Sequence, residues 1–350
     1  MNPKPTIELA SGLPAPPGAS GQSGRKGPSR PETVEREGQA SGEDRRRSDV
    51  GVRRDVRAFV IVVLVLIGCF ARPLGRLATL SWHSEIYSYI LLIPFVSIYL
   101  AWARKFDGVP PACRSWRLAM LPAAIGAMLV GVCWGALPAA AGEDVYLAII
   151  TLAFLCFVWA AALLVFGWPS LRQRLSPAAF LVFIVPFPSC VLNLLESFLQ
   201  HRSAYVAECM FSLSGMPVLR TDTFLKLPGI SLEVAPECSG IHSTLVLFLA
   251  SLGAGYLFLN SPWRRGLLAA AVLPLALLRN GFRIFTVGQL CVQISPAMID
   301  SYIHRRGGPI FFALSLIPLA LFLLWLRRGE LKTARRLEAR TGSAPAVQSP

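Results

Sequence analysis

The sequence has few charged residues for its length, and its cysteines and histidines form no metal-binding or redox motif. Of its 350 residues 15% are charged and four are histidine. None of the eight cysteines forms a CxxC pair, and no Cys/His spacing fits a zinc site. The net charge of +14 comes without any groove-reading motif. These absences exclude a zinc module, argue against a nucleic-acid partner, and imply no metal and no cofactor.

The chain is instead rich in long apolar runs, with 54% hydrophobic residues. Runs of about 18 or more apolar residues predict membrane-spanning helices, because about 20 residues cross about 30 Å of hydrocarbon. Strands are then expected only outside the bilayer. The predicted fold class is an all-α polytopic membrane protein with about eight transmembrane helices. The expected spans are residues 57–71, 86–103, 118–138, 145–167, 177–198, 239–260, 266–288 and 309–326.

The positive charges divide the connections between these runs into two classes. Lys and Arg gather in both tails and in alternate short loops, whereas the connections near 81–85 and 139–144 carry none. This bias predicts that both termini are cytoplasmic. Residues 1–55 are expected to be a disordered basic tail without a signal peptide. Residues 56–328 are expected to form the transmembrane domain, and residues 329–350 a cytoplasmic tail.

The longest outer connection is expected over residues 199–237. Its segment Ser203–Gly215 is too short to span, so we expect it to lie along the interface or to enter the membrane partly. Alternating polar and apolar residues around Pro228-Gly229 predict a small β-hairpin. This hairpin leads the chain directly to Cys238.

Three reactive side chains fall at the outer mouths of successive apolar runs, namely Cys238, Arg283 and His304. A helix N-terminus favours a cysteine thiolate, and its backbone N–H groups receive a developing oxyanion. The planar fork of an arginine suits the same anion, and histidine suits proton transfer near neutral pH. Together they have the parts of a cysteine acyl-transfer site.

Five neighbouring residues are assigned supporting roles: Glu237, Ser239, His242, Arg279 and Asn280. His242 rivals His304 as the acid/base, because helical spacing from residue 238 places it next to the thiol. Each residue also has an inert alternative. Cys238 is then a small apolar residue of a helix start, the two arginines extend to the lipid headgroups, and His304 is a solvated loop residue.

These motifs resemble the exosortase/archaeosortase family. The resemblance rests on Val234–Ile241, on Asn280–Ile284 and on His304 with Gly307-Gly308. Weaker agreement runs through Trp82, Tyr87–Pro94 and Tyr99–Trp102, and the likeness covers about residues 60–328. The position of His242 is commonly basic in relatives, often Arg.

The resemblance implies a cysteine transpeptidase of the bacterial inner membrane, linked to protein sorting and to exopolysaccharide or envelope biogenesis. Its partners would be membrane-anchored exported proteins of the PEP-CTERM kind, with a short motif, a helix and a basic end as the C-terminal tail. The lipid bilayer and an unidentified acyl acceptor complete the expected partners. By this analogy Cys238 is the nucleophile, Arg283 the stabiliser and His304 the acid/base.

Two other classes remain open from the sequence. A multi-pass transporter would hold an anionic substrate with Arg279 and Arg283 at mid-depth, usually within inverted repeats, and no repeat is seen. A polysaccharide-assembly protein would use loop charges for sugar phosphates and would not need Cys238. Within the enzyme class, the choice between water and an amine as acceptor is also open.

Overall fold

A computed structural model describes seven parts of the chain. They are residue 51 and residues 53–103, 115–135, 142–173, 175–235, 239–295 and 308–341. Glu237, Cys238 and His304 lie outside these ranges. The chain divides into two units, Met1–Arg54 and Asp55–Pro350, and nearly all of the described residues belong to the second unit.

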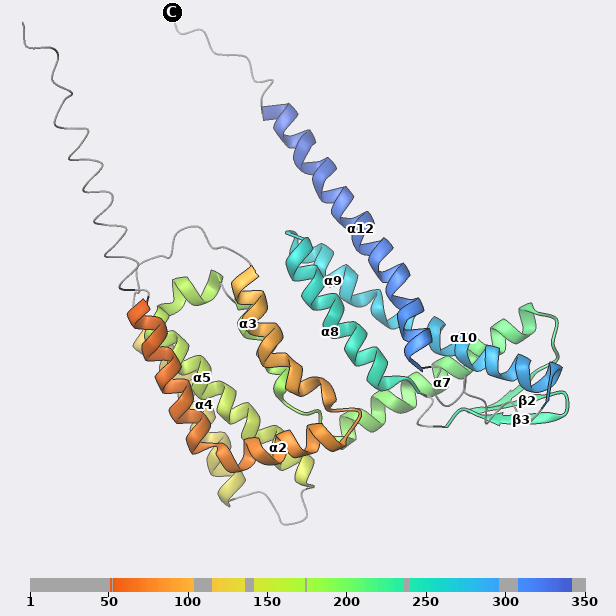
Figure 1. Ribbon diagram of the computed structural model, residues 1–350, viewed down its shortest axis with the longest axis horizontal. Coiled ribbons are helices and arrows are strands. Elements are labelled where there is room, and N and C mark those ends of the chain that lie inside the picture. The colour runs from red at the N-terminus through yellow and green to blue at the C-terminus, as the bar shows by residue number, and fades with distance from the viewer. Residues whose placement is uncertain are drawn as a thin grey trace, which may run out of the picture. The chain divides into compact units, whose positions relative to one another are not determined.

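Helices dominate the described residues (Figure 1). The first helix is Arg53–Cys69. It is followed by α2 (Ala71–His83), η1 (Ser88–Leu92), α3 (Ile93–Ala103), α4 (Trp116–Gly135), α5 (Glu143–Gln173), α6 (Leu175–Phe180), η2 (Leu181–Ile184), α7 (Ser189–Leu213), α8 (Ile241–Phe258), α9 (Pro262–Ala270), α10 (Val272–Gln293) and α12 (Gly308–Thr341). The strands are β1 (Leu219–Thr221), β2 (Phe224–Leu227) and β3 (Ile230–Glu233).

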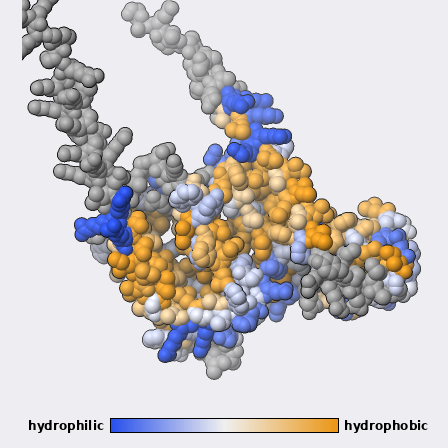
Figure 2. Space-filling view, viewed as in Figure 1, coloured by the Kyte–Doolittle hydropathy of each residue, from blue (hydrophilic) through white to orange (hydrophobic). Residues whose placement is uncertain are grey.

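The predicted class, an all-α polytopic membrane protein, is confirmed. Among the described residues five helices are long and apolar enough to cross a membrane, or up to seven if each of two bent pairs counts as one span. The helix pair Ser88–Ala103 is apolar but shorter. The visible surface of the helices is largely apolar, and hydrophilic residues gather toward the C-terminal end of α12 (Figure 2). Among the described residues, the five to seven long spans and this shorter apolar pair are consistent with the predicted multi-pass architecture.

The predicted continuous span 177–198 is wrong. The segment Leu175–Ile184 and helix α7 meet at an angle of 95°. The cause is Pro186 and Pro188 in the connection, because proline lacks an N–H group and restricts the residue before it to extended backbone. Residues 203–213, expected to lie along the interface or to enter the membrane partly, are the C-terminal part of the continuous helix α7.

The first predicted span, 57–71, corresponds to helix Arg53–Cys69, and the chain bends where this span ends. Helix Arg53–Cys69 and α2 form an angle of 80° where they meet at Phe70.

At the N-terminus of α7 the carboxylate of Asp144, from the start of α5, accepts the N–H of Ser189 at 2.6 Å. This contact brings the start of α7 to the level of the start of α5.

The predicted hairpin around Pro228-Gly229 is present and belongs to a three-stranded antiparallel sheet of order β1-β2-β3. Gly229 has a φ of 79°, which the two-residue turn requires and glycine adopts without strain. Alternate residues of the sheet are buried against α7 and α10. The buried set is Leu225, Leu227, Leu232 and Val234 with Ala204, Ala207, Phe211 and Ile284. Each fully buried Leu contributes about 2 kcal/mol.

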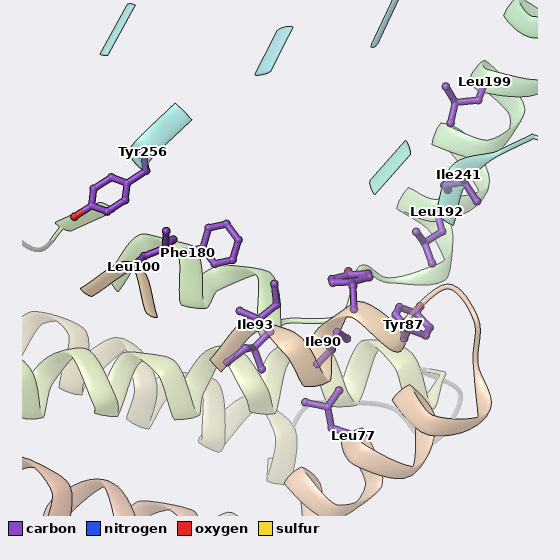
Figure 3. Packing of buried hydrophobic residues seen from close by; sticks show 12 residues of the cluster. Leu77, Tyr87, Ile90, Ile93, Leu100, Phe180, Leu192, Leu199, Ile241 and Tyr256 are labelled. Carbon is purple, nitrogen blue, oxygen red and sulfur yellow. The ribbon is translucent and has the colours of Figure 1, made fainter. Parts of the chain in front are cut away.

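A second core joins the first half of the chain to the helix that follows Cys238 (Figure 3). Its members come from α2, the η1–α3 segment, α6, η2, α7 and α8. The buried residues are Leu77, Tyr87, Tyr89, Ile90, Ile93, Leu100, Phe180, Ile184, Leu192, Leu199, Ile241 and Tyr256. Ile241, the first residue of α8, lies beside Leu192 and Leu199 of α7 (Figure 3). The position of the α8 start is thus set by apolar packing on α7.

Helices α7 and α10 approach each other closely at glycine. A Cβ atom at Gly281 would lie 2.9 Å from Cβ of Val206 and 3.3 Å from the backbone nitrogen of Ala207. Ala204 and Ala207 of α7 are fully buried at the same crossing. Small residues let helix backbones approach in membranes, where tight packing replaces the hydrophobic effect between helices.

We expect Gly281→Ala to destabilise the protein by about 1–3 kcal/mol, because overpacking forces the helices apart. Thermal unfolding of the detergent-solubilised protein measures this as a lower midpoint. Gly253→Ala is the matched control, since a Cβ atom there would meet no atom within 4 Å. Equal midpoints for the two variants would contradict the close crossing.

Candidate active site

The chain enters α8 through a glycine with unusual backbone geometry. Gly240 is the N-cap residue and has a φ of 71°, in the left-handed region. Its carbonyl accepts the N–H of Thr244 at 3.0 Å and the hydroxyls of Ser243 and Thr244. Helix α8 therefore begins at Ile241. The predicted span began two residues earlier, at residue 239. Gly240 interrupts the helical backbone, and the predicted contact of His242 with Cys238 stays a prediction because Cys238 lies outside the described residues.

Two side chains of α10 hold the backbone just before α8. The amide Nδ2 of Asn280 donates to the carbonyl of Ser239 at 3.2 Å. The guanidinium Nη2 of Arg279 donates to the carbonyl of Gly240 at 3.3 Å and to Oγ1 of Thr244 at 3.4 Å. A Cβ atom on Gly240 would lie 3.0 Å from Nη2 of Arg279. Glycine is therefore required by both its conformation and its neighbours. We call these contacts the α10 brace.

The α10 brace is buried. Arg279 is 8% exposed, Asn280 3% and Ser239 2%. The alternative in which Arg279 extends to the lipid headgroups is therefore wrong, because its guanidinium turns inward onto backbone oxygens. Within the described ranges its Nη1 atom is buried without a hydrogen-bond partner. Removing a guanidinium from water is costly. We therefore expect the N–H donors of Arg279 to form hydrogen bonds within the candidate site.

Arg283 lies one turn after Arg279 on the same face of α10 and is half-buried. Helix α10 continues ten residues beyond Arg283 to Gln293, further than the predicted span end at residue 288. Arg283 therefore lies on the same helix, α10, whose residues Arg279 and Asn280 contact the backbone of Gly240 and Ser239. Its proposed partner Cys238 lies directly before Ser239, outside the described residues.

His242 is engaged with the first half of the chain. Its Nε2 atom lies 3.3 Å from Oγ of Ser88. The hydroxyl of Ser88 donates to the carbonyl of Glu85 at 2.8 Å, which leaves its oxygen to accept an N–H from the imidazole. The contact links the start of η1, where the weaker family agreement lies, to the first turn of α8.

Glu196 and Gln200 of α7 also contact this segment and were not among the residues predicted from the sequence. Oε1 of Glu196 accepts the Ser239 hydroxyl at 3.4 Å, and Nε2 of Gln200 donates to the carbonyl of Val234. The signal was present, because a lone carboxylate in the apolar run before residue 199 is costly unless it has a function.

Of the predicted site residues, the structure brings together Ser239, Arg279 and Asn280, and places Arg283 on the same helix. His242 follows Ser239 closely in sequence but contacts Ser88. Glu237, Cys238 and His304 lie outside the described residues, so the convergence of Cys238, Arg283 and His304 stays a prediction.

The fold and the brace together define a polytopic helical membrane protein in which α10 holds the backbone of Ser239 and Gly240, directly after Cys238 in sequence. A family model described as transmembrane exosortase matches residues 81–321 of the 350. The chain belongs to the transmembrane exosortase family, as its motifs predicted. This membership supports a membrane transpeptidase or sorting role in general terms. No curated protein and no solved structure shows significant similarity to the chain.

We expect Asn280→Asp to weaken the site, because a carboxylate cannot donate to the Ser239 carbonyl and instead repels it. Leaving that buried acceptor without its donor costs about 1–3 kcal/mol. A lower thermal midpoint in detergent is the measurement. Gln293→Glu makes the same chemical change on the exposed end of α10 and serves as control. A midpoint unchanged in Asn280→Asp would show that the brace is not formed.

Proposed function

We propose that the chain is a membrane-embedded cysteine protease or transpeptidase that cuts the C-terminal sorting tails of exported proteins at the outer face of the bacterial inner membrane. One observation carries this proposal. The α10 brace joins two motifs 41 residues apart in sequence, since Asn280 holds the backbone of Ser239, the residue after Cys238. Two separate family motifs thus meet at one place, as a shared reaction requires.

The depth of the site supports an interfacial reaction. The span that contains α9 and α10 begins at Pro262, next to Arg264 and Arg265, and runs to Gln293. About 20 residues of helix cross the hydrocarbon, so a count from Pro262 reaches the opposite interface near Arg283. If the arginine-rich end is cytoplasmic, the brace and Arg283 lie toward the outer side.

The proposed chemistry is acyl transfer. The substrate's own helix packs against the enzyme and sets its scissile peptide at the interface, so remote binding energy orients the reacting bond. The Cys238 thiolate forms a bond to the carbonyl carbon, and the carbonyl electrons move to oxygen. Arg283 and the N–H groups at the start of α8, which no described side chain caps, stabilise that oxyanion.

The second half of the reaction releases the tail. When the tetrahedral intermediate collapses, the C–N bond breaks and His304 gives a proton to the leaving amine, which leaves a thioester on Cys238. His304 then takes a proton from the acceptor as it attacks the thioester, and the thiolate departs. Water as acceptor makes the enzyme a protease; an amine of a lipid or surface molecule makes it a transpeptidase.

The alternatives fit the brace less well. A transporter would present its arginines to a substrate path, whereas Arg279 is turned onto the backbone at the start of α8. A polysaccharide-assembly protein needs no buried donors beside a cysteine segment. Both alternatives predict that Cys238 is dispensable.

We expect Cys238→Ser to abolish tail removal while the protein remains inserted in the membrane, because a hydroxyl is a far weaker nucleophile than a thiolate. The measurement compares the sizes of membrane-anchored exported proteins that end in a helix and an arginine cluster. Cys190→Ser, an exposed cysteine on α7, is the matched control. Tails cut equally in Cys238→Ser and in the unmodified protein would favour the transporter or polysaccharide-assembly class.

We expect His304→Ala to be inactive and His242→Ala to be only slowed. The imidazole of His242 is engaged with Ser88, whereas proton transfer requires an imidazole that reaches the leaving amine. Tail-cleavage rates of the two variants, at equal amounts in the membrane, make the comparison. An inactive His242→Ala beside an active His304→Ala would reverse the assignment.

A further inference from the structure

Two polar side chains one turn apart on α7 hold the chain on either side of residues 236–238. Gln200 donates through Nε2 to the carbonyl of Val234, before this segment. Glu196 accepts through Oε1 the hydroxyl of Ser239, after it, at 3.4 Å. Both side chains are half-buried on an otherwise largely apolar stretch of helix. We call this pair the α7 anchor.

The groups that the α7 anchor binds are themselves buried. Val234 and Ser239 are each 2% exposed. A buried hydroxyl or carbonyl left without a partner costs about 1–3 kcal/mol, so these bonds decide where the chain lies. The backbone N–H of Val234 also donates to the carbonyl of Thr223 at 3.0 Å, which ties the same residue to the β-sheet.

The register of α7 is fixed independently of these bonds. Leu199, between the two anchor residues, is 1% exposed and packs in the core that includes Ile241 (Figure 3). On the other side of Ser239, Asn280 holds its carbonyl from α10. Ser239 therefore has its hydroxyl bound to one helix and its carbonyl bound to another.

We infer that Glu196 and Gln200 are positioning residues that fix both ends of the short segment carrying Cys238. This inference rests on the proposed function. Glu196 acts as a hydrogen-bond acceptor for Ser239 and carries no proton in the reaction. Such anchoring matters for rate, because a misplacement of about 1 Å costs about 100-fold in an oriented reaction.

The test compares Glu196→Ala, Glu196→Gln, Ser239→Ala and the double variant Glu196→Ala/Ser239→Ala. The full chain is reconstituted in proteoliposomes with an exported protein whose tail the unmodified enzyme cuts, and initial rates are measured over a range of substrate concentrations. Asn193→Ala, an exposed polar residue one turn earlier on α7, is the matched control.

Glu196→Ala is expected to lower kcat by at least about tenfold with KM within about twofold, because orientation is lost and tail binding is not. Glu196→Gln is expected to recover most of the lost rate, since its Oε1 still accepts the Ser239 hydroxyl. The double variant is expected to be no slower than either single variant, because both substitutions remove one interaction.

Three results would overturn the inference: a Glu196→Ala rate equal to that of Asn193→Ala, a Glu196→Gln rate as low as that of Glu196→Ala, or additive losses in the double variant. The second result would make Glu196 an ionised participant instead. If Glu196→Ala fails to insert, the isosteric Glu196→Gln and Ser239→Ala still decide the question.

The variant Cys238→Ala separates failure of this inference from failure of the proposed function. Tails cut by Cys238→Ala would refute the proposed function. An inactive Cys238→Ala together with a normal Glu196→Ala would refute only this inference.

Discussion

The requirement that buried polar groups be satisfied is the constraint on which this structure depends. Arg279 and Asn280 lie in the middle of an apolar helix, where each unbonded donor is expensive. They find acceptors in the carbonyls of Gly240 and Ser239, the last residues before α8. The cost of burying these side chains is offset only when this segment lies against α10. The same hydrogen bonds therefore give the buried side chains of α10 their acceptors and fix the position of Ser239 and Gly240, which follow Cys238 in sequence.

Other features of the fold support the same place. The glycine at position 281 lets α7 approach α10 closely enough for Glu196 and Asn280 to reach Ser239 from two sides. The β-sheet, packed on both helices, delivers Val234 to Gln200. The left-handed Gly240 then turns the chain into α8. Each element has a local reason to form, and together they leave one short segment held at both ends.

Much of this architecture could be predicted from the sequence, because apolar runs and turn residues act locally. The polytopic class and the hairpin at Pro228-Gly229 followed from hydropathy and alternation. The break before α7 results from Pro186 and Pro188, but these prolines lie within an apolar run that predicts one continuous span. The bend at Phe70 also has a cause in the sequence, because Pro73 has no N–H group to donate to the carbonyl of Cys69.

The site was predictable only as a set of residue types. Arg279 and Asn280 were assigned supporting roles, yet the backbone carbonyls that accept from them, those of Gly240 and Ser239, follow from no side-chain pattern. Glu196 and Gln200 were missed for the related reason that their partners, Ser239 and the carbonyl of Val234, lie more than thirty residues away in sequence. The pairing of His242 with Cys238 assumed a helix that begins at residue 239, whereas α8 begins at Ile241, and the pairing itself stays a prediction because Cys238 lies outside the described residues.

The central claim is that Cys238 carries an acyl group during the reaction, and its most direct test is to trap that thioester. The purified full-length enzyme is mixed with an exported protein bearing its sorting tail, quenched in acid and digested, and the peptide containing Cys238 is examined by mass spectrometry. The account predicts that this peptide carries the new C-terminus of the substrate through a thioester, and that hydroxylamine releases it as a hydroxamate. Tail cleavage that proceeds with Cys238 unmodified at every time point, and at a rate indifferent to hydroxylamine, would contradict the account.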